Sequence, residues 1–268
     1  MPQSTQAESS LDDVGGDDAL VSARGLTKTY SSGRGTVTAL EGLDLEIRNG
    51  EFISLLGPSG CGKSTALNII GGLLPASAGT VHVKGEQITG PRRDIGMMFQ
   101  KAVMLPWRTT LKNVLLPIEV FGRSKSDYLD RAHELLEMVG ISEFADSYPW
   151  QLSGGMQQRA ALCRVLIHDP DLLLLDEPFG ALDEFTRETM NKELLRVHAH
   201  TKKTTILVTH NISEAVFMSD RIAVMSARPG RLIDVIDVPF GRPRETELMR
   251  TQEFADIMFE ARALLDLR

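Results

Sequence analysis

Nine consecutive residues, 57–65, have the composition of a phosphate-binding loop. Their sequence, GPSGCGKST, fits the pattern G-x-x-x-x-G-K-[ST]. Glycines let the backbone curl so that successive N–H groups point at phosphate oxygens, and the N-terminus of a following helix adds partial positive charge. We expect Lys63 to reach the β- and γ-phosphates of a nucleotide and the Ser64 hydroxyl to ligate Mg²⁺. The predicted phosphate-binding residues are Gly57, Pro58, Ser59, Gly60, Cys61, Gly62, Lys63, Ser64 and Thr65.

Two neighbouring carboxylates, Asp176 and Glu177, follow the apolar run 172–175. This run is too short for a globular helix and predicts a strand that is buried on both faces. Parallel sheets bind ligands at the carboxyl ends of their strands, where this pair would lie. We expect Asp176 to hold Mg²⁺ directly or through water, and Glu177 to polarise an attacking water as a general base. The alternative is a surface Asp-Glu pair, and the phosphate-binding loop upstream favours the catalytic interpretation.

A serine and two glycines, Ser153, Gly154 and Gly155, open another predicted helix. Small residues at a helix N-terminus would form a second anion site. One nucleotide does not need two such sites. We therefore infer that this second site serves an ATP held by another copy of the chain.

The segments around these motifs predict the elements that must position them. Residues 52–56 predict a buried strand before the phosphate-binding loop, and residues 64–70 predict a helix after it. In the second half of the chain strands alternate with helices, which indicates a parallel α/β core. The first part instead predicts antiparallel hairpins, because 21–30 and 37–47 have strand character and Asn49-Gly50 is a turn signal. Further predicted strands are 81–83, 205–209, 222–225 and 232–238, and the predicted helical segments are 109–147, 154–167, 186–200 and the tail from about 245.

The composition bounds the class of protein. Of the 268 residues, 42% are apolar, which is ordinary for a soluble globular protein. No apolar run approaches the roughly 20 residues that a membrane span needs, and no signal peptide is apparent. The two cysteines, Cys61 and Cys163, do not make a disulfide framework, so a reducing, cytosolic setting fits.

The net charge of −7 is unevenly distributed along the chain. The first twenty residues hold five carboxylates and no Lys or Arg, and with their Ser and Gly they predict a disordered acidic leader over residues 1–19. The remaining chain is close to neutral. No segment has the basic character that is typical of nucleic-acid binding, so we expect no nucleic-acid partner.

Taken together, the motifs resemble those of the ATP-binding cassette (ABC) family. Residues 152–157, LSGGMQ, look like the signature motif of that family, with Met156 where Gln is commoner. The resemblance covers about residues 20–240. It implies a phosphate-loop NTPase core, in which a mostly parallel sheet is flanked by helices, with an N-terminal antiparallel β subdomain and a helical signature subdomain at about 101–160. Residues 241–268 would form a helical tail.

The resemblance also implies roles for single residues. Tyr30 matches the aromatic position that stacks on adenine, and a strand aromatic in the core is the alternative. Gln100 matches the glutamine that meets Mg²⁺ or the attacking water, and His210 matches the histidine that contacts the γ-phosphate. Asp183, in the segment 181–183, matches the loop that crosses to the partner subunit. ATP and Mg²⁺ are the cofactors implied, and a second copy of the chain is a partner.

The functional implication is an ATPase subunit that powers a bacterial importer. Because no membrane span is apparent, the pore would be a separate permease. The subunit would lie at the cytoplasmic face of the inner membrane and would act indirectly with a solute-binding protein. The alternatives are a soluble ABC ATPase that is not coupled to transport and an unrelated phosphate-loop enzyme such as a small-molecule kinase. One cassette without a long coiled coil argues against the former, and the signature motif argues against the latter.

Two further segments, 104–114 and 227–232, look like those of the nitrate, sulfonate and taurine importer group. We therefore expect one of these solutes as the cargo. Importers of pyrimidine or thiamine precursors have similar segments and remain the alternative. Trp107, in the first segment, is either a core anchor or a contact for the membrane partner. The enrichment of aromatic residues at interfaces favours the contact.

Overall fold

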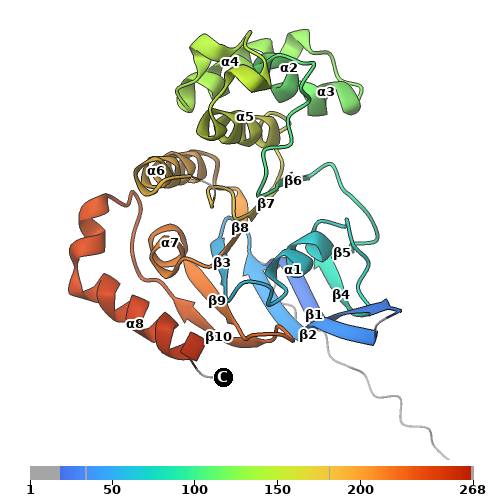
Figure 1. Cartoon of the computed structure of the whole chain (residues 1–268), viewed down its shortest axis with the longest axis vertical. Coiled ribbons are helices and arrows are strands. Elements are labelled where there is room, and N and C mark those ends of the chain that lie inside the picture. Colours follow the sequence, from blue (N-terminus) through green and yellow to red (C-terminus); the bar gives the residue numbers. More distant parts are fainter. Residues whose placement is uncertain (1–18, 34, 181, 267–268) are drawn as a thin grey trace, which may run out of the picture.

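Two β-sheets and a group of short helices make up residues 19–33, 35–180 and 182–266, which the computed structural model describes (Figure 1). The smaller sheet is antiparallel, with the strand order β2-β1-β4-β5. Its first two strands form the predicted hairpin, and both are longer than predicted. The predicted acidic leader lies outside the described residues, except that Ala19 already begins β1. The four strands are β1 (Ala19–Ser32), β2 (Gly35–Arg48), β4 (Ala78–Val83) and β5 (Glu86–Gln87).

The larger sheet has six strands in the order β10-β9-β3-β8-β7-β6. All of its neighbouring strands are parallel except β10, which pairs antiparallel with β9. The central strands are buried on both faces, which explains why they are continuous apolar runs in the sequence. The predicted parallel core is therefore confirmed. The strands are β3 (Phe52–Leu56), β6 (Ile95–Met98), β7 (Leu172–Asp176), β8 (Thr204–Thr209), β9 (Arg221–Met225) and β10 (Leu232–Asp237).

Helices cover both faces of the larger sheet. Helix α1 (Lys63–Ile70) lies between the two sheets and contacts strands of each (Figure 1). The opposite face packs against α6 (Glu184–Thr201), α7 (Ile212–Met218) and α8 (Gln252–Asp266). Alternate residues of one strand serve the two layers, so that in β7 Leu173 and Leu175 face α6 and α7 while Leu172 and Leu174 face α1.

A further group of helices lies at the top of Figure 1 and contacts the larger sheet at β6. Its members pack on one another around the buried face of α5, and residues 109–147 are mostly helical, as predicted. No helix in the described ranges is long and apolar enough to span a bilayer. The group contains α2 (Thr110–Val114), α3 (Leu116–Val120), η1 (Ser126–Tyr128), α4 (Leu129–Met138), η2 (Ser142–Phe144), η3 (Pro149–Gln151) and α5 (Gly154–Leu166), while η4 (Thr246–Arg250) precedes α8.

One helix, α7, and one contact that anchors the predicted helical tail went unpredicted. Helix α7 has a local signal that the sequence analysis did not use, since the Asn211 side chain accepts a hydrogen bond from the backbone N–H of Glu214 and caps the helix. The tail is anchored by Arg244, whose fully buried side chain donates to carbonyls at the C-terminal end of α7. Burial lowers the pKa of Arg244 to about 10, so this anchor stays charged at neutral pH.

One buried histidine predicts a pH dependence of stability. His198 on α6 is 4% exposed and packs edge-on against the ring of Phe52 at 5.2 Å. Burial, with the charge of Arg242 as the next cause, lowers its pKa to about 4, so the native state stays neutral where the unfolded chain takes up a proton. Stability should therefore fall as pH falls from about 6.5 towards 4, by about 2 kcal/mol at pH 5.

His198→Gln should remove this contribution. Urea unfolding at pH 7 and pH 5 would then show a smaller loss of unfolding free energy in the variant than in the wild type. His200→Gln is the matched control, because His200 is exposed on the same helix. Equal losses in the wild type and in His198→Gln would contradict the prediction.

Candidate functional site

A pocket of about 540 Å³ opens where the two sheets and the phosphate-binding loop meet. Its wall contains side chains from both sheets, from the loop and from the residues that follow β6 and β7. Most of the residues that the sequence predicts to bind nucleotide or metal are thus brought together. The lining residues are Tyr30, Val37, Ala39, Ser59, Gly60, Gly62, Lys63, Ser64, Thr65, Gln100, Asp176, Glu177 and Arg228.

The phosphate-binding loop joins β3 to α1 and is held by close backbone packing. Gly62 has φ +105°, and a Cβ there would come within 2.5 Å of the Ala39 carbonyl oxygen, so both conformation and space require glycine. The Lys63 side chain is buried, and its Nζ donates to the carbonyls of Gly57 at 2.7 Å and Pro58 at 2.9 Å. The ammonium therefore lies across the loop itself. Cys61, between these residues, is buried.

Ser64 and Asp176, both predicted metal residues, lie in contact. The Ser64 hydroxyl donates to Oδ1 of Asp176 at 2.8 Å. Burial at the end of β7 raises the pKa of Asp176, and the hydrogen bond from Ser64 partly opposes this shift. A hydroxyl and a carboxylate side by side provide hard oxygen donors of the type that Mg²⁺ prefers.

Glu177 lies between two predicted catalytic side chains. Nε2 of Gln100 donates to Oε2 of Glu177 at 3.1 Å, and Nδ1 of His210 lies 3.0 Å from Oε1. The backbone of Glu177 has φ +43°, a left-handed conformation that is uncommon outside glycine and is concentrated at functional sites. Three residues that are distant in sequence are thus joined by hydrogen bonds across the ends of β6, β7 and β8.

Tyr30 lines the same pocket as these carboxylates. It pairs with Val37 across the β1–β2 hairpin, and both residues line the pocket. Its side chain is 43% exposed, so the alternative of a core aromatic is wrong. An exposed ring beside the phosphate-binding loop can accept a flat base on its face.

The residues predicted to form a second anion site and a crossing loop lie outside this pocket. Ser153 caps α5, where its Oγ accepts from the N–H of Met156 at 3.3 Å. Asp183 caps α6 through the N–H of Thr186 at 3.0 Å, and the hydrogen bonds from Thr186 lower the pKa of its carboxyl group. Ala181 lies outside the described residues. None of Ser153, Gly154, Gly155 and Asp183 lines the pocket of its own chain.

Arg228 is a pocket residue to which the sequence analysis gave no role. It lies in the segment 227–232, which carried only a resemblance to an importer group. No local pattern marks this arginine, because it reaches the phosphate-binding loop through the pairing of β9 with β3. Only the three-dimensional arrangement identifies it.

Comparisons with known proteins agree with this arrangement. Residues 40–180 match the family model described as ABC transporter. An ABC transporter ATP-binding protein of Methanocaldococcus jannaschii is 44% identical over 85% of this chain and 86% of its own length. A taurine import ATP-binding protein of Rhizobium johnstonii is 43% identical over 86% of this chain and 90% of its own length. An aliphatic sulfonates import ATP-binding protein of Bacillus cereus is 42% identical, with 85% and 90% covered.

Solved structures give the same result. A dimeric ATP-binding cassette in a post-hydrolysis state, bound to ADP and Pi, has a TM-score of 0.74 and 36% identity, and the match covers 82% of this chain and all of that one. The predicted phosphate-loop NTPase fold is therefore confirmed. The match of family, relatives and fold over most of the sequence leads to one conclusion: the chain belongs to the ABC transporter family, among its ATP-binding proteins.

Proposed function

We propose that this chain hydrolyses ATP at the pocket described above and that the hydrolysis drives solute import through a separate membrane permease. The observation that carries the proposal is the position of Glu177, which is hydrogen-bonded to Gln100 and His210 beside the phosphate-binding loop. A carboxylate held in this way can orient and polarise a water molecule. The names of the relatives support coupling to import.

Each part of the nucleotide would meet a different part of the pocket. The N–H groups of the loop and the Lys63 ammonium would bind the phosphates. To do so, Lys63 would release the carbonyls of Gly57 and Pro58 and bind phosphate oxygens instead. Tyr30 would stack on the adenine. Ser64 and Asp176, with Gln100 nearby, would hold Mg²⁺, which when bound neutralises charge on the phosphate oxygens. Among the residues that the structure describes, no three His, Cys, Asp or Glu side chains cluster as metal ligands. Phosphate oxygens and water would therefore complete the coordination of Mg²⁺.

The catalytic step assigned to this chain is a proton transfer. Glu177 would accept a proton from the attacking water, which makes the water oxygen a better nucleophile towards the terminal phosphate. Gln100 and His210 would fix the carboxylate through its two oxygens. Half of the His210 side chain is exposed, so its other ring nitrogen would contact the γ-phosphate while Nδ1 keeps its contact with Glu177.

A second copy of the chain would complete each site. Ser153, Gly154, Gly155 and Asp183 lie outside the pocket of their own chain, although the first three have the form of an anion site. A two-fold partner could present this region to the nucleotide of the first chain. The structural relative is a dimer, which supports a site completed by a second copy.

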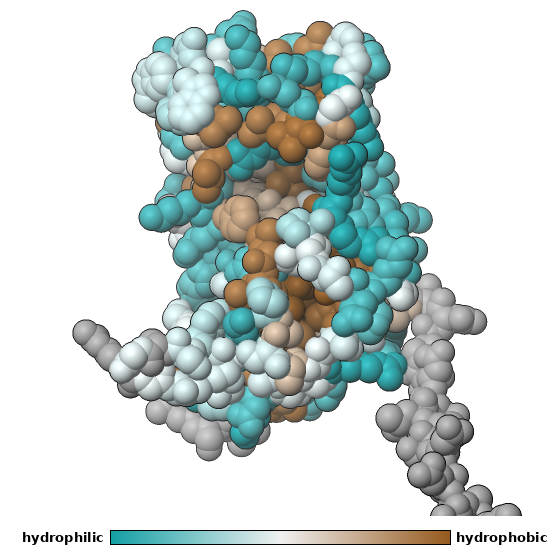
Figure 2. Space-filling view, turned by 90° about the vertical axis from the view of Figure 1, so that its right-hand side faces the viewer, coloured by the Kyte–Doolittle hydropathy of each residue, from teal (hydrophilic) through white to brown (hydrophobic). Residues whose placement is uncertain are grey.

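The helical group is proposed as the permease-facing part. Trp107 is 70% exposed, so its alternative as a core anchor is wrong. Its loop is rigid, because the buried Asn113 side chain bonds to Leu105, Arg108 and Thr109 backbone atoms. Figure 2 shows hydrophobic residues gathered on this group and in the hollow below it. The chain would thereby sit at the cytoplasmic face of the inner membrane as a peripheral subunit, and a solute-binding protein would deliver cargo to the permease.

The proposed cargo is a small sulfonate, taurine or nitrate. The support is the names of relatives that import taurine and aliphatic sulfonates, together with the resemblance of segments 104–114 and 227–232 to that importer group. A soluble ABC ATPase that is not coupled to transport is the alternative, and it predicts no uptake phenotype.

Glu177→Gln tests the catalytic step. The variant should bind ATP as the wild type does, because the amide has the same shape, and should hydrolyse it about 10²- to 10⁴-fold more slowly. Phosphate release by the purified full chain is the measurement, with ATP binding measured in parallel. Glu188→Gln, an exposed change on α6, is the control. Hydrolysis at the wild-type rate in Glu177→Gln would remove Glu177 from the mechanism.

Mixed dimers test the sharing of sites. Lys63→Ala and Ser153→Arg should each inactivate a homodimer, because every site then lacks one component. A dimer that carries one chain of each variant has one intact site, with Lys63 from one chain and Ser153 from the other. Two affinity tags would isolate this dimer, and its ATPase activity should partly return. No recovery in verified mixed dimers would indicate that each site belongs to a single chain.

Uptake assays test the cargo. Cells that lack this subunit should lose uptake of one or more of nitrate, taurine and alkanesulfonates, and the wild-type gene but not Lys63→Ala should restore it. A pyrimidine precursor and a thiamine precursor serve as comparison solutes. If only a comparison solute is lost, the cargo class is wrong and the transport function stands. If every solute enters normally, the uncoupled ATPase becomes the better description.

A further inference from the structure

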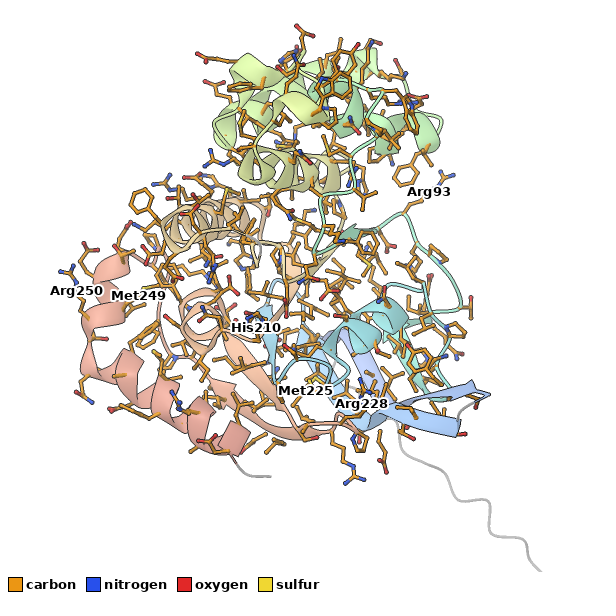
Figure 3. All side chains as sticks on the ribbon, in the orientation of Figure 1. Arg93, His210, Met225, Arg228, Met249 and Arg250 are labelled. Carbon is orange, nitrogen blue, oxygen red and sulfur yellow. The ribbon has the colours of Figure 1, made fainter. Side chains whose placement is uncertain are left out.

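The turn between β9 and β10 lies against the phosphate-binding loop. Figure 3 shows His210, Met225 and Arg228 around the loop that joins β3 to α1. A Cβ placed on Gly57 would lie 2.9 Å from the Met225 carbonyl oxygen, so the two backbones are in direct contact. The turn is therefore part of the wall that holds the loop in shape.

The same turn is fixed to the neighbouring sheet. The N–H of Gly230 donates to the Ala39 carbonyl at 3.0 Å, and the N–H of Glu41 donates to the Gly230 carbonyl at 2.9 Å. A Cβ on Gly230 would lie 1.9 Å from the Cys61 carbonyl oxygen, which no other residue could accommodate. Two hydrogen bonds to β2 and a glycine contact thus hold the turn against the phosphate-binding loop.

Arg228 is the side chain that this turn presents to the loop. Its Nε and Nη2 donate to the Gly60 carbonyl oxygen at 3.2 and 3.0 Å. Gly60 itself has φ +75°, so the peptide that follows it can take an orientation that other residues disfavour. Among the described residues no carboxylate forms an ion pair with Arg228, whereas Arg231 in the same turn pairs with Glu41 at 2.9 Å.

The orientation of one peptide follows from this contact. In a planar trans peptide the C=O and the N–H point in opposite directions. Because the guanidinium binds the Gly60 carbonyl, the N–H of Cys61 points away from Arg228 and towards the Pro58 carbonyl within the loop. That N–H now makes only a long bond of 3.3 Å to the Pro58 carbonyl, which an anionic oxygen would replace. A charged donor on the carbonyl also polarises the peptide and strengthens its N–H as a donor.

We propose that Arg228 is a positioning residue for nucleotide binding, which holds the Gly60–Cys61 peptide so that the Cys61 N–H faces a nucleotide phosphate. The proposal rests on the proposed function, in that the loop binds the phosphates of ATP. Arg228 acts through the loop and not on the reacting atoms. Its loss should therefore weaken nucleotide affinity and raise KM, with a smaller effect on kcat.

Arg228→Ala in the full chain is the test, with Arg231→Ala as the matched control from the same turn. We expect the Kd for ATP to rise about tenfold in Arg228→Ala, the effect of losing a charge-assisted hydrogen bond, and to stay within about twofold in Arg231→Ala. A purely architectural role would lower the Tm of the nucleotide-free protein. The positioning role leaves that Tm unchanged and reduces the rise in Tm on adding ATP.

The outcomes separate this proposal from the one on which it rests. Wild-type affinity in Arg228→Ala, an equal loss in Arg231→Ala, or a loss explained by a lower nucleotide-free Tm would each overturn the role of Arg228. Lys63→Ala serves as the reference for the site. If the wild type and Lys63→Ala bind ATP equally weakly, the proposed nucleotide site itself is wrong.

Discussion

The parallel pairing of β3 with β8, and of β8 with β7, is the constraint on which the site depends. Because parallel strands end at the same edge of a sheet, this pairing places the phosphate-binding loop, Glu177 and His210 next to one another. The loop lies more than a hundred residues before Glu177, and Glu177 lies 33 residues before His210. The strands are buried on both faces, and their register, which pairs Leu56 with Thr209 and Asp176 with Val208, sets the spacing of the chemical groups.

The polar groups of the pocket satisfy one another in this structure. Lys63 binds loop carbonyls, Ser64 binds Asp176, and Gln100 and His210 bind Glu177. Each of these contacts joins groups that a nucleotide, a metal ion or a water molecule would also engage. Binding therefore exchanges internal hydrogen bonds for external ones, which avoids the cost of unpartnered buried polar groups in either state. Burial is the main cause of the raised pKa of Asp176, and the neighbouring Glu177 carboxylate adds to the rise.

Close backbone contacts at glycines hold the phosphate-binding loop in its conformation and position. Gly62 lies against β2, Gly57 against β9, and Gly230 of the β9–β10 turn against Cys61. Backbones that approach so closely cannot shift independently, so a displacement of the turn reaches the loop directly. The predicted signature residues 153–155 lie in the helical group and outside this pocket, as the proposed two-chain site would require.

The sequence by itself determined the phosphate-binding loop, its flanking strand and helix, the Asp176-Glu177 pair and the α/β class, because each is a local pattern whose period or residue spacing carries its physical cause. It also placed most strands and helices correctly, and overlooked α7 despite the cap at Asn211. Tertiary structure alone decided three things: the exposure of Tyr30 and Trp107, the bonding of Glu177 to both Gln100 and His210, and the contact of Arg228 with Gly60. These depend on which strands pair and how two sheets pack, and contacts between residues this far apart leave no periodic trace in a single sequence.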